Sequence, residues 1–283
     1  MRAIQSFAED VKRVISQRLG DGYCVHVLET EKNNGVIQTE LCIKEKGSRF
    51  APSIYLTDLF EDYRNGMGFE EVVEHILVLY SSRAEVPSGV EEILNDMGFE
   101  KIKDKIMFKL IHTGENDSLL KKVPSIPYLD MSIVFYLLCD NGEDMSMTLM
   151  IENKHQEYWK RSTDELYQEA LANMQKQFPS ALFKLPVEGM FLLTNSRHFF
   201  GAAVLLYPGV LKLCEEELGK DFFIIASCVD EVMLIRSSSV GGKISSKFQK
   251  VIACTSEKNI PAEERLSNHA YRYCSLEDKV ISI

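Results

Sequence analysis

The sequence contains no uninterrupted apolar run as long as the roughly 18 residues that a bilayer-spanning helix needs. Residues 1–19 carry charges where a signal peptide would have its apolar core. Positive charge is also scarce, with 32 Lys and Arg against 42 Asp and Glu, which gives a formal net charge of −10. Broad binding to nucleic acid needs clustered Lys and Arg on one face. These absences predict a soluble, cytoplasmic protein that binds neither membranes nor nucleic acid.

The local motifs of several enzyme classes are missing as well. The sequence has no G-x-x-x-x-G-K-[ST], G-x-G-x-x-G, H-E-x-x-H, C-x-x-C or G-x-S-x-G. Its seven cysteines are an odd number, and several lie in apolar runs, so reduced thiols are expected rather than a disulfide framework. The sequence therefore predicts no catalytic residue, no cofactor and no metal site. Enzymes that lack a local motif stay open.

Apolar periodicity predicts hairpins and amphipathic helices along the whole chain. The predicted strands are 23–29, 36–44, 51–56, 105–112, 133–139, 145–151, 190–194, 201–207, 222–226, 232–235 and 270–274. The predicted helices are 4–19, 69–80, 163–178, 208–219, one or two short ones in 90–103, and one carrying apolar residues over 244–252. Asn33-Asn34-Gly35 is typical of a tight hairpin turn, and Ser162 with Glu165 of a capping box. The pattern predicts the α+β class, with mainly antiparallel sheets built from hairpins and helices on their faces.

A proline-containing connector at 123–127 predicts a domain boundary. It would separate an N-terminal α+β region, 1–123, from a C-terminal α+β region of hairpins and interleaved helices, 128–283. Residues 56–100 hold eleven acids and two bases, nearly the whole charge imbalance. This acidic segment is either a solvated helical surface or a docking face for a basic partner protein.

Polar residues gather in three short stretches. Ser227-Cys228-Val229-Asp230-Glu231 links two apolar strands, so a serine or thiol there could act as a nucleophile with a base from elsewhere, or the stretch is an ordinary turn. A nucleophilic Cys228 is disfavoured because adjacent carboxylates raise a thiol pKa. In Asn195-Ser196-Arg197-His198, Arg197 could bind a carboxylate or phosphate, or the loop is simply solvated. Glu152 to His155 offers a histidine base, or polar residues at the start of a helix with Trp159 as a packing anchor.

Two hypotheses follow for function. The first is a non-catalytic binding or regulatory module for a protein or small molecule. The alternative is a hydrolase that uses the 195–198 and 227–231 loops, which would have to converge around a carboxylate of perturbed pKa. The candidate ligand or partner surface comprises Tyr55, Asn195, Arg197, Ser227, Asp230 and Glu231.

Several short pieces, taken in order, resemble an uncharacterised bacterial family, domain of unknown function 5688. They are residues 51–56, Leu193-Thr194-Asn195, Gly201-Ala202-Ala203, Leu206-Tyr207-Pro208, Ser227 with Glu231, and Leu266-Ser267 before Tyr271 and Tyr273. The resemblance runs nearly end to end and implies one family unit over 1–283. The family pattern at 227–231 is Ser-Ser-x-His-Glu, whereas this chain has Cys228 and Asp230, so histidine chemistry is not expected there. The resemblance implies a soluble bacterial cytoplasmic protein and no activity, substrate or cofactor.

Overall fold

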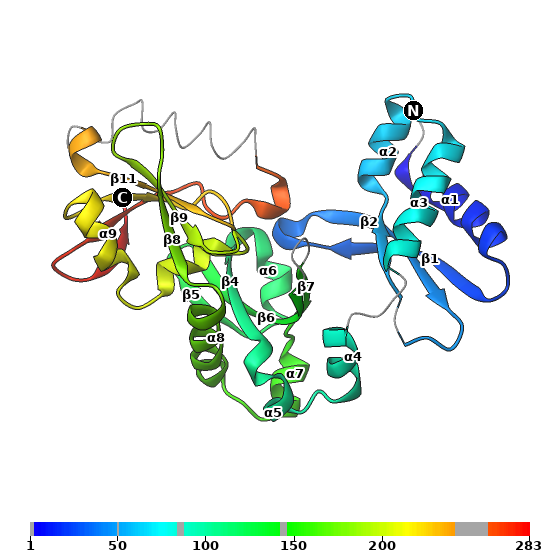
Figure 1. The fold of residues 1–283 in the computed structure, drawn as a ribbon, viewed down its shortest axis with the longest axis horizontal. Coiled ribbons are helices and arrows are strands. Elements are labelled where there is room, and N and C mark those ends of the chain that lie inside the picture. The colour runs from blue at the N-terminus through cyan, green and yellow to red at the C-terminus, as the bar shows by residue number, and fades with distance from the viewer. Residues whose placement is uncertain (1–2, 50, 84–87, 142–145, 241–259) are drawn as a thin grey trace. The chain divides into compact units, whose positions relative to one another are not determined.

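The structure is a computed structural model that describes residues 3–49, 51–83, 88–141, 146–240 and 260–283 (Figure 1). The chain divides into two compact units, Met1–Glu91 and Glu92–Ile283, and the division falls inside helix α4 (Ser88–Asn95). Every strand pairing in the described residues is antiparallel, and helices accompany the sheets, which confirms the α+β class. None of the described helices is both long enough and apolar enough to cross a membrane.

The first unit is a three-stranded sheet, in the order β1-β2-β3, packed against helices. Its elements are α1 (Ile4–Leu19), β1 (Tyr23–Glu31), η1 (Asn33–Gly35), β2 (Ile37–Glu45), β3 (Ser53–Tyr55), α2 (Thr57–Arg64) and α3 (Phe69–Arg83). Phe7 of α1 and Leu41 of β2 are fully buried in one apolar core. Asn34 and Gly35 have φ of 60° and 66°, so the predicted hairpin turn is confirmed.

The second unit contains two antiparallel sheets. In the smaller sheet, β6 pairs with β4, with β5 and with β7. The larger sheet has the strand order β13-β12-β10-β11-β9-β8. The strands are β4 (Ile106–His112), β5 (Ser125–Tyr128), β6 (Met131–Asn141), β7 (Ser146–Met150), β8 (Ser180–Lys184), β9 (Met190–Asn195), β10 (Phe223–Ile225), β11 (Val232–Ile235), β12 (Ala270–Cys274) and β13 (Lys279–Ser282). The helices are α5 (Phe99–Ile102), η2 (Lys103–Lys105), η3 (Gly114–Asn116), α6 (Asp117–Leu120), α7 (Asn153–Trp159), α8 (Thr163–Gln177), η4 (Gly201–Leu206), α9 (Val210–Leu218), η5 (Ser237–Val240) and η6 (Ala262–Glu264).

Helix α8 is fixed to η2 and β4 by contacts between its side chains and their backbone. The buried Asn173 amide donates hydrogen bonds to the carbonyls of Lys103 (2.7 Å) and Ile106 (2.9 Å). The Phe108 amide donates to Met174 Sδ at 3.3 Å. These contacts seat the helix on the smaller sheet and bury the apolar stripe that the sequence predicted for it.

The connector predicted as a domain boundary lies within the second unit. Residues 125–128 form the edge strand β5, and β5 and β4 both pair with β6. Strands from both sides of the predicted boundary therefore share one sheet, and the chain divides earlier, at Glu91. Pro127 is tolerated because an edge strand has an open side where a missing N–H breaks no ladder hydrogen bond.

One predicted strand is wrong. Residues 201–207 were expected to extend along a sheet, but Gly201–Leu206 is the 3-10 helix η4, and β9 pairs with β8 and β11 instead. Phe200 has a left-handed φ of 49°, which turns the chain away from the sheet. The apolar residues of η4 are buried in the interior, so apolar composition alone did not indicate a strand. The helix predicted over 244–252 lies outside the described residues.

The predicted capping box at the start of α8 is confirmed. The Glu165 amide donates to Ser162 Oγ at 3.2 Å, and the Ser162 amide donates to Glu165 Oε2 at 2.7 Å. We expect Ser162→Ala to lower the free energy of unfolding by about 1 kcal/mol and Ser162→Asn to leave it nearly unchanged, since asparagine caps as well as serine. Urea denaturation of the three proteins checks this, and equal losses in both variants would contradict it.

Candidate functional site

The two loops proposed from the sequence lie side by side in the second unit. Strands β9 and β11 are antiparallel neighbours, with Leu193 opposite Val232. The loop that follows the end of β9 and the loop that precedes the start of β11 therefore lie at the same edge of the sheet. The Phe200 amide donates to Asp230 Oδ1 at 2.7 Å, and Thr194 Oγ1 donates to the Asp230 carbonyl at 2.6 Å. Asp230 is thus held from both its side chain and its backbone.

Gly201 makes this close approach possible. A Cβ at this position would lie 2.0 Å from Thr194 Oγ1 and 2.3 Å from the Asp230 carbonyl oxygen. No side chain fits between these atoms, so the convergence of the two loops depends on glycine at 201.

Asn195, a predicted ligand-surface residue, holds its own loop together. Its side chain is fully buried, and its Nδ2 donates to the Phe199 carbonyl at 2.7 Å. Its Oδ1 accepts the amides of Arg197 (3.0 Å) and Phe199 (3.3 Å). Asn195 therefore positions the exposed Arg197 and His198, and its amide is already occupied within the loop.

A second segment joins the 227–231 loop through a short backbone ladder. The Val229 amide donates to the Glu264 carbonyl at 2.9 Å, and the Leu266 amide donates to the Ser227 carbonyl at 3.0 Å. This ladder brings the side chain of Glu264 to the loop. Glu264 is not among the residues predicted from the sequence, because nothing local marks a carboxylate that comes from so far along the chain.

The result is an acidic cradle, by which we mean the side chains of Cys228, Asp230, Glu231 and Glu264. The ligand atoms of three of them, Cys228 Sγ and one carboxylate oxygen each of Asp230 and Glu264, lie within 4.8 Å of one another. All four side chains are partly buried. Thiol and carboxylate groups at this separation could hold a metal ion.

Burial raises the pKa of each of the three carboxyl groups in the cradle. For Glu231 and Glu264, the negative charge of Asp230 raises the pKa further. For Asp230, the hydrogen bond from Phe200 and the charges of Lys109 and His198 lower the pKa again, but burial outweighs them. The protein therefore holds like charges close together where water screens them only in part.

The thiol of Cys228 is not an activated nucleophile. Burial raises its pKa to about 11, and the carboxylates of Asp230, Glu264 and Glu231 contribute after burial. The thiolate that would attack a substrate is therefore scarce at neutral pH. The direction agrees with the sequence expectation, although desolvation is the larger cause.

A buried tyrosine packs against Phe200, the residue whose amide binds Asp230. Tyr136 on β6 packs edge-on against the ring of Phe200, with 5.2 Å between ring centroids, and its side chain is almost fully buried. Burial raises its pKa well above the ordinary value, and the charges of Tyr207 and Asp230 raise it further. Its hydroxyl has no hydrogen-bond partner among the described residues.

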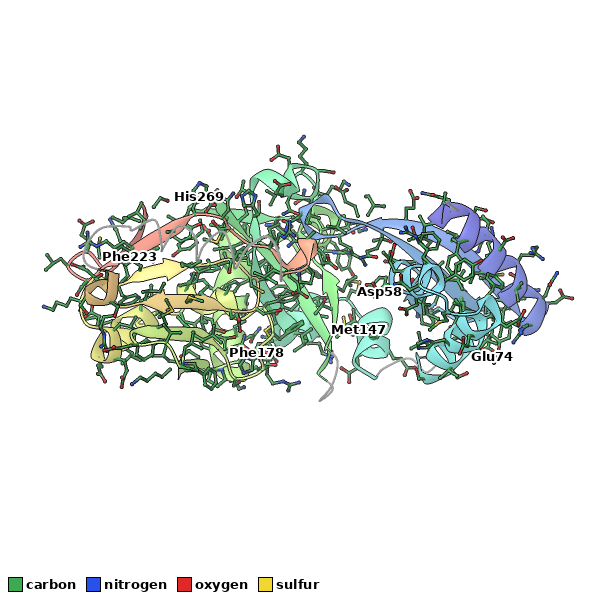
Figure 2. All side chains as sticks on the ribbon, turned by 90° about the horizontal axis from the view of Figure 1, so that it is seen from above. Asp58, Glu74, Met147, Phe178, Phe223 and His269 are labelled. Carbon is green, nitrogen blue, oxygen red and sulfur yellow. The ribbon has the colours of Figure 1, made fainter. Side chains whose placement is uncertain are left out.

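A second polar cluster surrounds Asp130, at the turn between β5 and β6. Ser267 Oγ donates to Asp130 Oδ2 at 2.8 Å, His269 Nδ1 lies 2.9 Å from the same oxygen, and the Tyr271 hydroxyl donates to Oδ1 (His269 is labelled in Figure 2). His112 Nε2 is 3.9 Å from Oδ2. Burial acts to raise the pKa of Asp130, but the hydrogen bonds from Tyr271, His269 and Ser267 hold it below its ordinary value. No local sequence pattern marks this cluster.

The remaining residues proposed from the sequence lie elsewhere. Tyr55 belongs to the first unit, where Lys32 Nζ donates to its hydroxyl at 3.0 Å. His155 caps α7, because its Nδ1 accepts the Glu152 amide at 3.0 Å, and Trp159 Nε1 donates to the Met97 carbonyl at 2.6 Å. The helix-start interpretation of residues 152–155 therefore accounts for their contacts.

The part of the acidic segment that lies in the first unit carries paired as well as solvated carboxylates. Asp58 and Glu74, on α2 and α3, are labelled in Figure 2. Arg18 of α1 forms ion pairs with Glu70 and Glu74, so α3 is tied to α1 through part of this acidic surface. A docking role for the segment stays a prediction.

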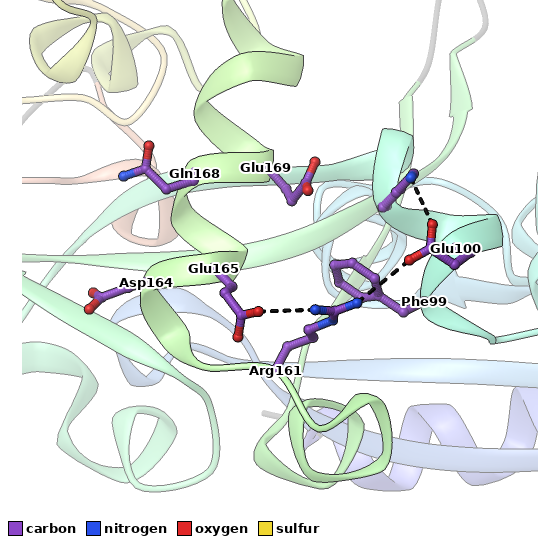
Figure 3. A pocket seen from close by; sticks show the side chains of 8 residues that line it. Phe99, Glu100, Arg161, Asp164, Glu165, Gln168 and Glu169 are labelled. Carbon is purple, nitrogen blue, oxygen red and sulfur yellow. Dashed lines mark hydrogen bonds and ion pairs between the residues drawn. The ribbon is translucent and has the colours of Figure 1, made fainter.

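A shallow pocket of about 310 Å³ lies elsewhere in the second unit, between α5 and the start of α8 (Figure 3). Arg161 pairs with Glu165 at 3.0 Å and Glu100 at 3.5 Å, and its guanidinium lies 4.4 Å from the Phe99 ring centroid. Lys103 also pairs with Glu100, at 2.7 Å. Because both cations in its lining bind carboxylates of the same lining, this pocket is a weaker candidate than the cradle.

Comparison with known proteins gives one family. The model of the Family of unknown function (DUF5688) matches residues 4–186 and 182–275. No curated protein and no solved structure matches the chain. The two matched segments together cover most of the sequence and both structural units, in agreement with the resemblance seen in the short pieces. The chain belongs to the DUF5688 family.

Proposed function

We propose that the protein is a binding module and that its acidic cradle binds a cationic ligand. The observation that carries this proposal is the meeting of Cys228, Asp230 and Glu264, from two chain segments, with their ligand atoms within 4.8 Å. Glu231, the next residue in the chain after Asp230, adds a third carboxylate that interacts electrostatically with Asp230.

The electrostatic balance of the cradle supports a cation. Three carboxylates lie close together and partly out of water, an arrangement that lowers the stability of the folded chain when all are ionised. Lys109 and His198 offset part of this for Asp230. A bound cation would remove the remaining repulsion, so the arrangement is advantageous in a protein whose ligand is positively charged.

The hydrolase alternative retains one supporting feature, the electrostatic effect of His198, which lowers the pKa of Asp230 and of Glu231. Against it, Asn195 is occupied within its loop and the Cys228 thiol is mostly protonated at neutral pH. Activity of the wild type on simple ester or phosphate-ester substrates, lost in Glu231→Gln, would favour the hydrolase.

Thermal unfolding of the full chain tests the binding proposal. Mg²⁺, Mn²⁺, Zn²⁺ and spermidine would be added separately, with citrate as an anionic comparison. A ligand at about 100 times its Kd stabilises the folded state by about 2.7 kcal/mol, which raises Tm by several degrees. We expect at least one cation to raise the Tm of the wild type in this way. In Glu264→Gln, the apparent Kd for that cation should rise at least tenfold.

The matched control is Glu188→Gln, an exposed carboxylate outside the cradle. It should respond to the cation as the wild type does. A wild type that no cation stabilises, or a Glu264→Gln variant with an unchanged response, would refute the proposal.

Asp230→Asn should stabilise the protein when no cation is present. The carboxyl is harder to ionise in the folded chain, since burial raises its pKa, so its charge at neutral pH lowers stability. Asparagine removes the charge and keeps Oδ1 as acceptor for the Phe200 amide. We expect Tm to rise by about 2–4 °C, corresponding to about 1 kcal/mol, at pH 7 with a chelator present. A lower Tm would mean that the charged hydrogen bond outweighs the burial.

A further inference from the structure

We infer that the acidic cradle is a binding site for a divalent transition-metal ion, best fitted to Zn²⁺, with Cys228 Sγ, Asp230 and Glu264 as its protein ligands. The inference rests on the proposed function and names the class of cation. The three donor atoms lie within 4.8 Å of one another, as ligands of one ion must.

The donor set selects the class of metal. Mg²⁺ and Ca²⁺ take oxygen ligands, whereas a thiolate is a soft donor that suits Zn²⁺ and related ions. One sulfur and two carboxylates make three protein ligands. Zinc sites with three protein ligands keep a fourth position for water or a bound molecule.

The backbone holds two of these ligands in place before any ion binds. The Val229 amide donates to the Glu264 carbonyl, and the Ser227 carbonyl accepts the Leu266 amide, so the ladder fixes Cys228 and Glu264 relative to each other. Asp230 Oδ1 accepts the Phe200 amide, which orients the carboxylate and leaves Oδ2 for an ion. Hydrogen bonds of this kind behind a ligand orient it and raise metal affinity.

A separate observation indicates that something more binds here. Tyr136 is almost fully buried, its ring lies against Phe200, and its hydroxyl lacks a partner among the described residues. Phe200 connects Tyr136 to the cradle, because its ring packs on Tyr136 and its amide donates to Asp230 Oδ1. Buried polar groups in proteins nearly always have a hydrogen-bond partner, so a water or ligand atom bound beside Asp230 is a candidate partner for this hydroxyl.

Binding is a ligand exchange without redox chemistry. The S–H bond of Cys228 breaks, a sulfur–metal bond forms, the proton passes to solvent, and waters leave the ion. Neither an oxidant nor a reductant is required.

Cobalt provides the test, because Co²⁺ replaces Zn²⁺ in such sites and a cobalt–thiolate bond gives a charge-transfer band in the near ultraviolet. The reduced full chain would be titrated with Co²⁺ and then with Zn²⁺. We expect the band to saturate at one Co²⁺ per chain and to disappear as Zn²⁺ displaces the cobalt. Cys228→Ser should abolish it, and Glu264→Gln should weaken Co²⁺ binding at least tenfold.

Cys24→Ser is the matched control, since Cys24 is an exposed thiol in the first unit. It should keep the band, and circular dichroism should show that every variant is folded. A band that survives in Cys228→Ser would place the cobalt elsewhere and overturn the inference. A wild type without the band, but stabilised by Mg²⁺ or spermidine through Glu264, would overturn the zinc site and leave the proposed cation binding intact. Absence of any cation response would overturn both.

Discussion

Gly201→Ala should destabilise the second unit by about 3 kcal/mol or more. The new Cβ would have to occupy space 2.0 Å from Thr194 Oγ1 and 2.3 Å from the Asp230 carbonyl oxygen. One of these atoms is backbone, so a side-chain rotation cannot relieve the clash. The 195–200 and 227–231 loops would have to separate, and the hydrogen bond from Phe200 to Asp230 would break with them.

Thermal and urea unfolding would measure the loss. Gly22→Ala is the matched control, because Gly22 lacks a left-handed φ and a Cβ there meets no atom within 4 Å. We expect that control to change stability little, and any cation response of the wild type to be lost in Gly201→Ala alone. If Gly201→Ala unfolds at the wild-type midpoint, Gly201 does not lie this close to Thr194 and Asp230 in solution.

The second large effect is expected for Asp130→Ala, at about 3 kcal/mol. Asp130 accepts hydrogen bonds from Ser267 and Tyr271, whose side chains are buried. Removal of the carboxylate leaves the buried Tyr271 hydroxyl only Ser267 as a partner and deprives Ser267 of its acceptor. Glu188→Ala, which removes an exposed carboxylate, should change stability by less than about 0.5 kcal/mol. Similar losses in the two variants would contradict a stabilising role for the hydrogen bonds to Asp130.

The same carboxylate should give the protein a specific acid sensitivity. Hydrogen bonds hold the pKa of Asp130 below its ordinary value in the folded chain, so its contribution to stability is complete above the unfolded-state pKa. It is then lost as the pH falls through the lower, folded-state pKa. His112, His269 and Tyr271 are the titratable groups that face it. We therefore expect the gap in Tm between wild type and Asp130→Ala to be wide at neutral pH and to narrow in strong acid.

Local chemistry determined the elements that the sequence predicted well. The turn at Asn34-Gly35 needs positive φ at both residues, and the Ser162 capping box needs only two side chains three positions apart. Both signals lie within a few residues and act through backbone groups of the same element. The 3-10 helix at Gly201–Leu206 was missed because its apolar residues suit a strand equally well. What decides its form is the contact of Gly201 with Thr194 and Asp230, which only the folded chain supplies.

The candidate site was predictable only in part, for the same reason. Concentrated polar residues between two apolar strands marked Asp230 and Glu231, but no local signal marked Glu264 or Tyr136. Asn195 was proposed as a ligand residue, and the structure shows its amide bound inside its loop. A sequence gives the type of a side chain, whereas its direction depends on backbone turns such as the left-handed His198.

The ladder between Val229 and Glu264 has a consequence for how the family can diverge. It fixes Cys228 and Glu264 relative to each other by hydrogen bonds between their own chain segments, whatever the number of residues that separates them in the sequence. Sequence changes elsewhere in the chain that leave this ladder in place can therefore accumulate in evolution while the geometry of Cys228, Asp230 and Glu264 is retained.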